Sequence, residues 1–163
     1  MIVKVFGEVQ YNRTSPNTFT IKDVIYDSER SRVYTLYDED DSTFEYTVLA
    51  CSDSANNLDY IKELRDYKIV PNANLYDGNG QLYTFLQNFM NTTVFVLIRW
   101  NTPIGSINSF IYINDMGAST SDGIAIARFN SDNSAIYVVL NNTLLNKASI
   151  CKVNTNDLTS NIS

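Results

Sequence analysis

The sequence of 163 residues contains no histidine, and this absence excludes more chemistry than any other feature of the composition. Histidine is the commonest general base, the commonest metal ligand and the usual base beside a serine or cysteine nucleophile. An enzyme of this sequence would have to use carboxylates, a lysine or a metal held by oxygen. We therefore expect a protein that is not an enzyme and has no cofactor.

Cysteine is nearly absent as well. Cys51 and Cys151 stand far apart, each in an apolar segment. Without histidine, two thiols cannot supply the four nitrogen or sulfur ligands of a structural zinc site. A disulfide between them would need an oxidising compartment, whereas free cysteines behave as small buried hydrophobes. The sequence therefore favours two buried thiols.

The sequence has no long apolar run. The longest one, at 94–98, is far shorter than the roughly 20 residues that a membrane-spanning helix needs. Residues 1–10 lack the small-residue cleavage site of a secretory signal. We expect no cleaved signal peptide and no transmembrane segment, and hence a location in a virion or in the cytoplasm.

Basic residues are few, with 12 Lys and Arg against 18 Asp and Glu and a formal net charge of -6. Nucleic-acid binding depends on clustered Lys and Arg, and these residues form no cluster in the sequence. Insertion into a membrane is not expected either. The expected partners are protein subunits of the same assembly, and the chain should form an oligomer or part of a complex.

Asparagine is abundant, with 20 residues against 6 lysines. An AT-rich gene would raise both residues, so base composition does not explain the difference. We expect such a neutral polar surface in a protein that works in a crowded assembly or at a cell exterior.

Most segments alternate apolar and polar residues, which indicates half-buried β-strands. In one of them, Phe44, Tyr46, Val48 and Ala50 are expected to face the core and Thr47 the solvent. Comparable strands are expected at 2–10, 18–26, 32–37, 94–100, 109–114, 124–129, 135–140 and 147–153. The polar segment 129–135 predicts a hairpin between two of them.

Two central segments break this alternation. Leu58, Ile61 and Leu64 recur at helical spacing, and a second helix is expected after residue 80, although a strand would also fit there. The predicted fold is one β-rich α+β domain of residues 1–153, with mainly antiparallel sheet, sandwich-like or meander, and about two central helices. A β-sandwich with a helical insertion is the alternative.

Residues 154–163 form a polar C-terminal arm with Leu158 and Ile162 as its only large apolar residues. Ordering costs about 1 to 2 kcal/mol per residue, so the isolated arm should be mobile unless a neighbouring subunit receives these two side chains. Trp100, which ends the most apolar strand, is the third candidate partner-binding residue. Its ring would suit a saccharide or an interface, or would simply belong to the core.

Acidic residues offer two further candidate sites. The run at 38–41, with Glu45 nearby, could hold calcium, but four consecutive carboxylates cannot all point inward, so we interpret it as a solvated hairpin loop. Glu63 and Asp66 could form an acid and base pair on the first predicted helix, but they lie opposite its apolar stripe. We therefore assign no catalytic and no metal-binding residue.

The sequence thus predicts a non-enzymatic structural or interaction module of a larger assembly, such as a head, tail or attachment protein of a bacteriophage-type virion. One alternative is a small acidic, soluble inhibitor that occupies a partner's basic groove. Another is a carbohydrate-binding domain or an oxygen-ligand metal domain.

Residues 75–86 resemble an EF-hand loop at their centre, with Asp77, Asn79 and Gly80 in the third, fifth and sixth positions. The end positions hold Leu75 and Leu86, which have no oxygen ligand, so we interpret 77–80 as a turn. Millimolar calcium should therefore leave the melting temperature unchanged in a thermal melt. A rise of several degrees that disappears in Asp77→Ala would contradict this interpretation.

Overall fold

The computed structural model describes residues 18–40, 43–55, 57–92, 94–113, 123–142, 147–158 and 160–162. Within these residues the chain forms β-strands and no α-helix. The strand expected at 2–10 lies outside the described residues. The same described residues contain no helix of the length and apolar character that crossing a membrane requires.

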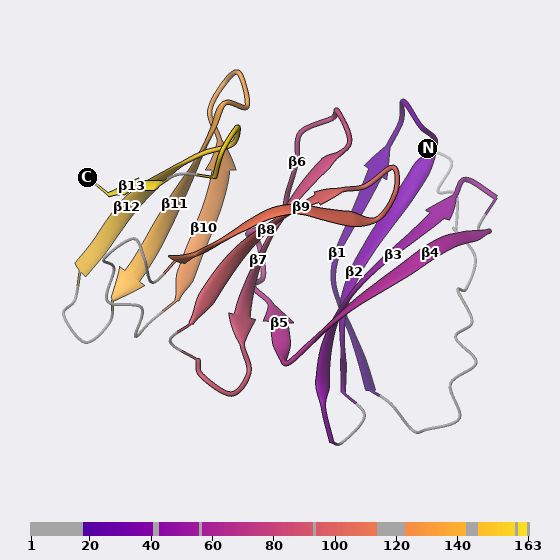
Figure 1. Cartoon of the computed structure of the whole chain (residues 1–163), viewed down its shortest axis with the longest axis horizontal. Helices are drawn as coiled ribbons and strands as arrows, with labels where there is room; N and C mark the ends of the chain where they lie inside the picture. The colour runs from indigo at the N-terminus through magenta and orange to yellow at the C-terminus, as the bar shows by residue number, and fades with distance from the viewer. Residues whose placement is uncertain are drawn as a thin grey trace, which may run out of the picture.

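The strands form three antiparallel sheets in succession along the chain (Figure 1). Sheet A contains β1 (Thr18–Asp27), β2 (Arg32–Asp40), β3 (Glu45–Asp53) and β4 (Leu58–Arg65), in that order. Sheet B contains β5 (Tyr67–Ile69), β7 (Gln81–Asn88), β8 (Phe95–Asn101) and β9 (Ser106–Tyr112), and β6 (Leu75–Tyr76) also pairs with β7. Sheet C contains β10 (Ile124–Phe129), β11 (Ala135–Asn142), β12 (Lys147–Asn154) and β13 (Ser160–Ile162).

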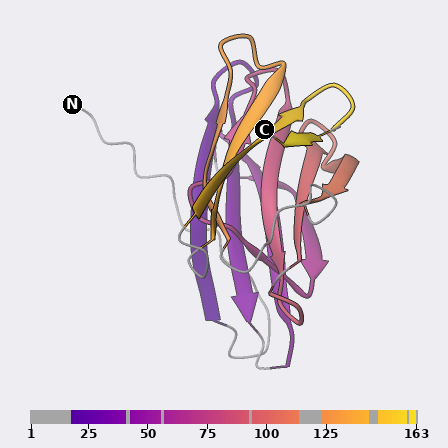
Figure 2. The same cartoon turned by 90° about the vertical axis from the view of Figure 1, so that its left-hand side faces the viewer.

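Sheet B lies between the other two sheets (Figure 1), and the three sheets overlap in the view along the stack (Figure 2). A separate apolar cluster fills each interface. Alternate residues of each strand of sheet B point to opposite interfaces, as the pleat requires. In β8, Val96 and Ile98 face sheet A, whereas Phe95 and Leu97 face sheet C. The central sheet is therefore apolar on both faces.

The predicted β-strands that lie within the described residues are confirmed, apart from shifts at their ends. They correspond to β1, β2, β3, β8, β9, β10, β11 and β12. The hairpin predicted at 129–135 joins β10 to β11, and the amide of Asn130 donates to the carbonyl of Ala135 at 3.0 Å.

Both predicted helices are wrong, and with them the α+β class, because these segments are strands β4 and β7. In β7, Leu82 and Leu86 face sheet A while Tyr83 and Phe85 face sheet C. A strand buried on both faces has apolar residues at neighbouring positions, so some of them, such as Leu82, Phe85 and Leu86, also fall at helical spacing.

Strand β4 mimicked a helix for a different reason. Its residues Tyr60 and Leu64 pack against the cluster between sheets A and B, whereas Ile61 packs on the opposite face of sheet A. Leu58 is exposed, and a register shift in the pairing with β3 lies between Leu58 and Tyr60. The spacing of Leu58, Ile61 and Leu64 therefore combines residues from two different faces.

Strand β3 corrects a second expectation. Val48 and Ala50 are buried as predicted, but in a small cluster on the outer face of sheet A rather than in the interface with sheet B, and Phe44 and Tyr46 are only half-buried. Thr47 was expected to face solvent, but it is also fully buried, and its Oγ1 donates to the carbonyl of Tyr67 at 2.9 Å. The strand has no wet face, because β5 of sheet B covers its other side.

The C-terminal segment belongs to sheet C. Leu158 is 3% exposed and lies in the cluster between sheets B and C. The following strand β13 pairs with β12, with Ile162 opposite Cys151. The chain itself therefore buries Leu158 and pairs the segment that holds Ile162, so a neighbouring subunit is not needed to order them.

Polar groups join the sheets at one end of the stack. Asp27, at the end of β1, is 2% exposed and accepts hydrogen bonds from Tyr76 at 2.5 Å and from Arg30 at 3.0 Å. Arg30 in turn donates to the carbonyl of Asn79, which ties the β1–β2 turn to the β6–β7 hairpin of sheet B. Sheets B and C are joined by Arg99, which donates to the carbonyl of Thr155 at 2.6 Å.

The burial of Thr47 leads to a prediction about folding stability. Thr47→Asp and Val48→Asp should both abolish cooperative unfolding in urea, because each places an unpaired charge in the interior. Ser149→Asp, at an exposed position of β12, should unfold much as the parent does. A Thr47→Asp variant as stable as Ser149→Asp would show that this face of β3 is not buried.

The Asp27 network leads to a prediction about pH. Burial alone would raise the pKa of Asp27, but hydrogen bonds from Tyr76 and Arg30 and the charge of Arg30 together lower it below its ordinary value of 3.8. The carboxylate therefore contributes stability above that value, and the contribution is lost as pH falls through the lower pKa of the folded state.

Asp27→Asn should lower the free energy of unfolding at pH 7 by about 2 kcal/mol, as expected for charge-assisted hydrogen bonds. The difference from the parent should shrink below pH 3.8. Glu29→Gln removes an exposed carboxylate from the same turn and should change stability by less than about 0.5 kcal/mol. Urea unfolding at several pH values checks both variants, and equal effects of the two would contradict the assigned role of Asp27.

Candidate functional site

The structure places Trp100 in the core. Its side chain is 2% exposed and packs in the cluster between sheets A and B. A ring at this position cannot stack on a saccharide or on a partner protein without opening that interface. The role of Trp100 in this structure is packing.

Residues 77–80 form the turn of the β6–β7 hairpin. Asp77 Oδ1 accepts hydrogen bonds from the amides of Asn79 and Gln81, at 2.7 and 2.9 Å, so this carboxylate is already used within the turn. Gly78 and Gly80 have positive φ values, of 81° and 93°, which explains glycine at both positions. The described ranges contain no group of three or more side chains that could together hold a metal ion.

Residues 38–40 of the acidic run at 38–41 are not the solvated loop that the sequence suggested, and Asp41 lies outside the described residues. Asp38, Glu39 and Asp40 are the last residues of β2 and pair with both β1 and β3. Glu39 is 2% exposed, and Asp38 is largely buried. The other acidic pair is separated by the end of β4: Glu63 lies within this strand, whereas Asp66 lies in the following turn and pairs with Arg65 at 3.5 Å.

The two cysteines are free and buried, as the sequence predicted. Cys51 lies in the cluster between sheets A and B, and Cys151 lies in the cluster between sheets B and C. Burial raises the pKa of each thiol to about 11. Both are therefore protonated at neutral pH, and neither is a nucleophile.

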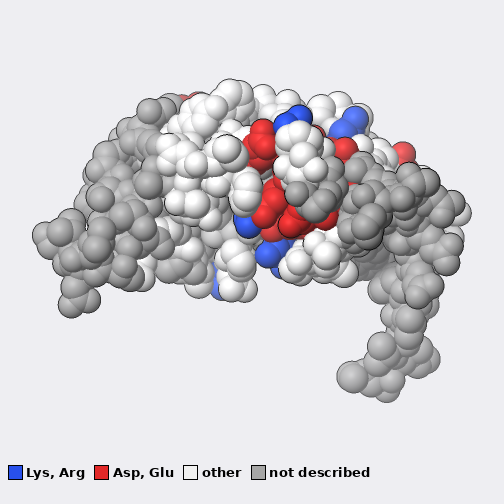
Figure 3. Space-filling model, turned by 90° about the horizontal axis from the view of Figure 1, so that it is seen from below, with Lys and Arg blue, Asp and Glu red and all other residues white. Residues whose placement is uncertain are grey.

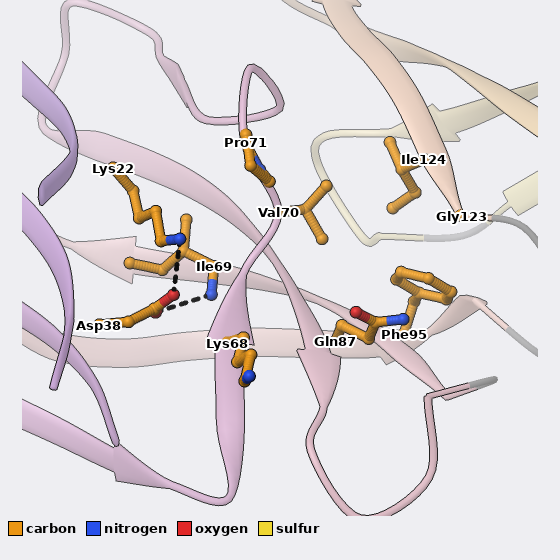
Figure 4. A pocket seen from close by; sticks show the side chains of 10 residues that line it. All are labelled: Lys22, Asp38, Lys68, Ile69, Val70, Pro71, Gln87, Phe95, Gly123 and Ile124. Carbon is orange, nitrogen blue, oxygen red and sulfur yellow. Dashed lines mark hydrogen bonds and ion pairs between the residues drawn. The ribbon is translucent and has the colours of Figure 1, made fainter. Parts of the chain in front are cut away.

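The best candidate for a binding site is a cavity where the first strands of the three sheets come together (Figure 4). It has a volume of about 300 Å³. Sheet A contributes Lys22 and Asp38, sheet B contributes the segment around Lys68, and sheet C contributes Ile124. Three segments far apart in the sequence thus build one cavity.

One wall of the cavity is charged. Lys22 Nζ lies 3.2 Å from Asp38 Oδ2, and the amide of Ile69 donates to Asp38 Oδ1 at 2.9 Å. Burial raises the pKa of Asp38, although the hydrogen bond from Ile69 and the ion pair with Lys22 oppose this rise. Asp38 thus joins sheet A to β5 and fixes the position of the Lys22 ammonium group.

The second cation of this wall is Lys68, whose Nζ lies 2.7 Å from Glu45 Oε1. Glu45 begins β3 and does not line the cavity, so it holds the lysine from outside. This end of the stack, seen from below in Figure 3, shows acidic side chains gathered near its centre with basic side chains beside them. The charged wall thus consists of two ion pairs, Lys22 with Asp38 and Lys68 with Glu45.

The rest of the cavity is mainly apolar. Val70, Pro71, Phe95 and Ile124 line it opposite or beside the charged wall (Figure 4). Gln87 is the additional polar group, and its Nε2 donates to the carbonyl of Thr92 at 2.7 Å. The amide is therefore held in place by the β7–β8 loop.

A second surface of interest is the outer face of sheet C. Ile126, Val139 and Ile150 lie directly opposite one another on β10, β11 and β12, on the face that points away from sheet B. Ile150 is 50% exposed and the other two are half-buried. The adjacent row consists of Arg128, Tyr137 and Lys152, all exposed.

The outer face of sheet A is also apolar along β1. Ile21 and Val24 are 66% and 57% exposed, opposite Tyr37 and Thr35 of β2. Phe19 and Tyr26 share this exposed side of β1. Apolar side chains are therefore exposed on the outer faces of both end sheets.

The sequence analysis predicted neither the cavity nor the apolar row on the outer face of sheet C. No motif marks the cavity, because its lysines are isolated in the sequence and their pairing depends on how sheets A and B pack. The outer face of sheet C gave a weak signal, since Tyr137, Val139 and Ile150 interrupt an otherwise simple alternation of polar and apolar residues.

Comparison with known proteins gives no match. No family model, no curated protein and no solved structure corresponds to the chain. A functional proposal for this protein therefore depends on its own residues and geometry.

Proposed function

We propose that the chain is a non-enzymatic structural module of a larger assembly, and that it docks onto further copies of itself through the outer faces of its end sheets. The observation that carries this proposal is the apolar row Ile126, Val139 and Ile150 on the outer face of sheet C. A phage-type virion, the setting that the composition suggests, is one assembly of this kind.

The interfaces within the chain indicate what would cover this row. Sheets A and B, and sheets B and C, already pack face to face through alternating apolar side chains. Among the described residues no sheet lies on the outer face of sheet C, where Ile126, Val139 and Ile150 alternate along their strands with residues that face sheet B. A further sheet of the same kind is the occupant that this geometry fits.

Charge supports a second copy of this chain as the source of that sheet. The charged residues described on β10–β12 of this face, Arg128 and Lys152, are both basic. The chain as a whole carries a net charge of -6, and the outer face of sheet A presents Glu63, opposite Val48, and Arg65, opposite Tyr46. Docking sheet C of one copy on sheet A of the next would place the basic residues of sheet C near Glu63, in a chain that is acidic overall.

Docking of this kind is head to tail, because the two contacting faces differ. Such heterologous contacts continue from copy to copy until they close a ring or extend a filament. Four-stranded sheets stacked by their faces are also the units of β-propellers, which close with four to eight blades. Either outcome would make the chain a repeated component of an assembly.

The test measures mass in solution by sedimentation velocity over a range of micromolar concentrations. The parent chain should form oligomers as concentration rises. Ile150→Asp on sheet C and Ile21→Asp on sheet A should each remain monomeric, because each removes one of the two contacting faces. Both positions are exposed, so neither change should lower the melting temperature by more than a few degrees.

Mixing the two variants provides the sharper test. Ile150→Asp retains the sheet A face and Ile21→Asp retains the sheet C face, so an equal mixture should form dimers that grow no further. Met90→Asp is the matched control, since Met90 is 80% exposed in the loop between β7 and β8, away from both outer faces. A monomeric parent chain, or equal loss of assembly in Met90→Asp, would overturn the proposal.

A further inference from the structure

The cavity between the three sheets suggests a function that does not depend on docking between copies. It is bounded by strands from all three sheets, so its shape is set by the two apolar interfaces rather than by one loop. Binding sites are commonly such preformed concave spaces, mostly apolar and with a few polar groups that converge.

The charged groups favour an anion. Among the residues that line the cavity, Lys22 and Lys68 are cationic and Asp38 is the acidic side chain. Asp38 is already engaged, since one oxygen accepts from the Ile69 amide and the other pairs with Lys22. The carboxylate therefore presents no free charge that would select a cation.

Both lysines retain hydrogen-bonding capacity. An ammonium group has three donors, and the ion pairs described above use one donor of each lysine. Asp38 and Glu45 also restrain the two lysine side chains. The lysines would therefore lose less conformational entropy when a ligand binds. Each ammonium group thus has donors left for a small anion.

The remaining surface favours an organic anion over an inorganic one. Val70, Phe95 and Ile124 are largely buried and present only a small apolar surface to the cavity, which a hydrocarbon body would contact and phosphate or sulfate would not. The volume of about 300 Å³ corresponds to about ten water volumes. This limits the ligand to a small molecule.

We infer that this cavity binds a small organic carboxylate, with the carboxylate between Lys22 and Lys68 and an apolar body against Val70, Phe95 and Ile124. Gln87 lies beside Phe95 in the cavity (Figure 4), and its side-chain carbonyl oxygen can accept a hydrogen bond from a hydroxyl or amide substituent of the ligand. The chain is thereby assigned a ligand-binding site in addition to its packing surfaces.

The experiment uses the full chain and four probes of matched size or charge: hexanoate, hexylammonium, hexanol and inorganic phosphate. Binding is followed by titration in ¹H–¹⁵N NMR spectra, with the amides of Ile69 and Gly123 as reporters because both residues line the cavity. Hexanoate should shift these amides in a saturable way, at least tenfold more tightly than the other three probes. Equal binding of hexanol would overturn the proposal, as would tighter binding of hexylammonium or an absence of saturable binding.

Variants locate the site. Lys68→Met keeps most of the aliphatic stem and removes the charge, and it should weaken hexanoate binding about tenfold, as expected for loss of a charge-assisted hydrogen bond. Lys62→Met is the matched control, because Lys62 is exposed on β4 and does not line the cavity, and it should bind like the parent. Equal affinities of the two variants would exclude the assigned site.

A double variant addresses the second lysine without leaving a buried charge. Lys22→Met combined with Asp38→Asn removes both charges of the ion pair, and the carbonyl oxygen of the new side-chain amide can still accept from the backbone amide of Ile69. Binding of hexanoate should fall by about tenfold while the melting temperature stays within a few degrees of the parent. Unchanged binding in this folded variant would also overturn the proposal.

Discussion

The burial of both faces of sheet B is the constraint on which the rest of the structure depends. Strands β7 and β8 direct alternate side chains into two different clusters, so an unpaired charge placed in either cluster would be buried away from water. Sheets A and C are each held by one of these clusters. The removal of apolar surface from water at the two interfaces is therefore what joins the three meanders into one body.

Apolar packing is not directional, so it does not by itself fix the relative positions of the sheets. Polar contacts at the edges of the sheets fix these positions. Asp27 joins sheet A to sheet B through Tyr76 and Arg30, and Arg99 joins sheet B to sheet C. At the other end, Asp38 holds the amide of Ile69. Such charge-assisted bonds require particular geometry, so they select one arrangement among the many that would bury similar area.

This arrangement has two consequences for function. Where the first strands converge, the sheets leave a cavity with lysines from sheets A and B. Where the stack ends, the outer faces of sheets A and C expose apolar rows of the kind that the inner interfaces bury. The first feature suits a small ligand and the second suits another sheet, and each follows from stacking rather than from a local motif.

The sequence by itself determined most strand positions, the hairpin at 129–135 and the burial of both cysteines, because these depend on alternation and local polarity. It could not identify β7 as a strand, since the pattern that separates a strand from a helix disappears when both faces are covered. It could not identify β4 either, because the apolar residues of this strand lie on two different faces. Tertiary structure alone decided that Thr47, Trp100 and Leu158 are buried and that Lys22 and Lys68 share a cavity. These outcomes depend on which sheet lies against which, and contacts between distant segments leave no periodic trace in the sequence.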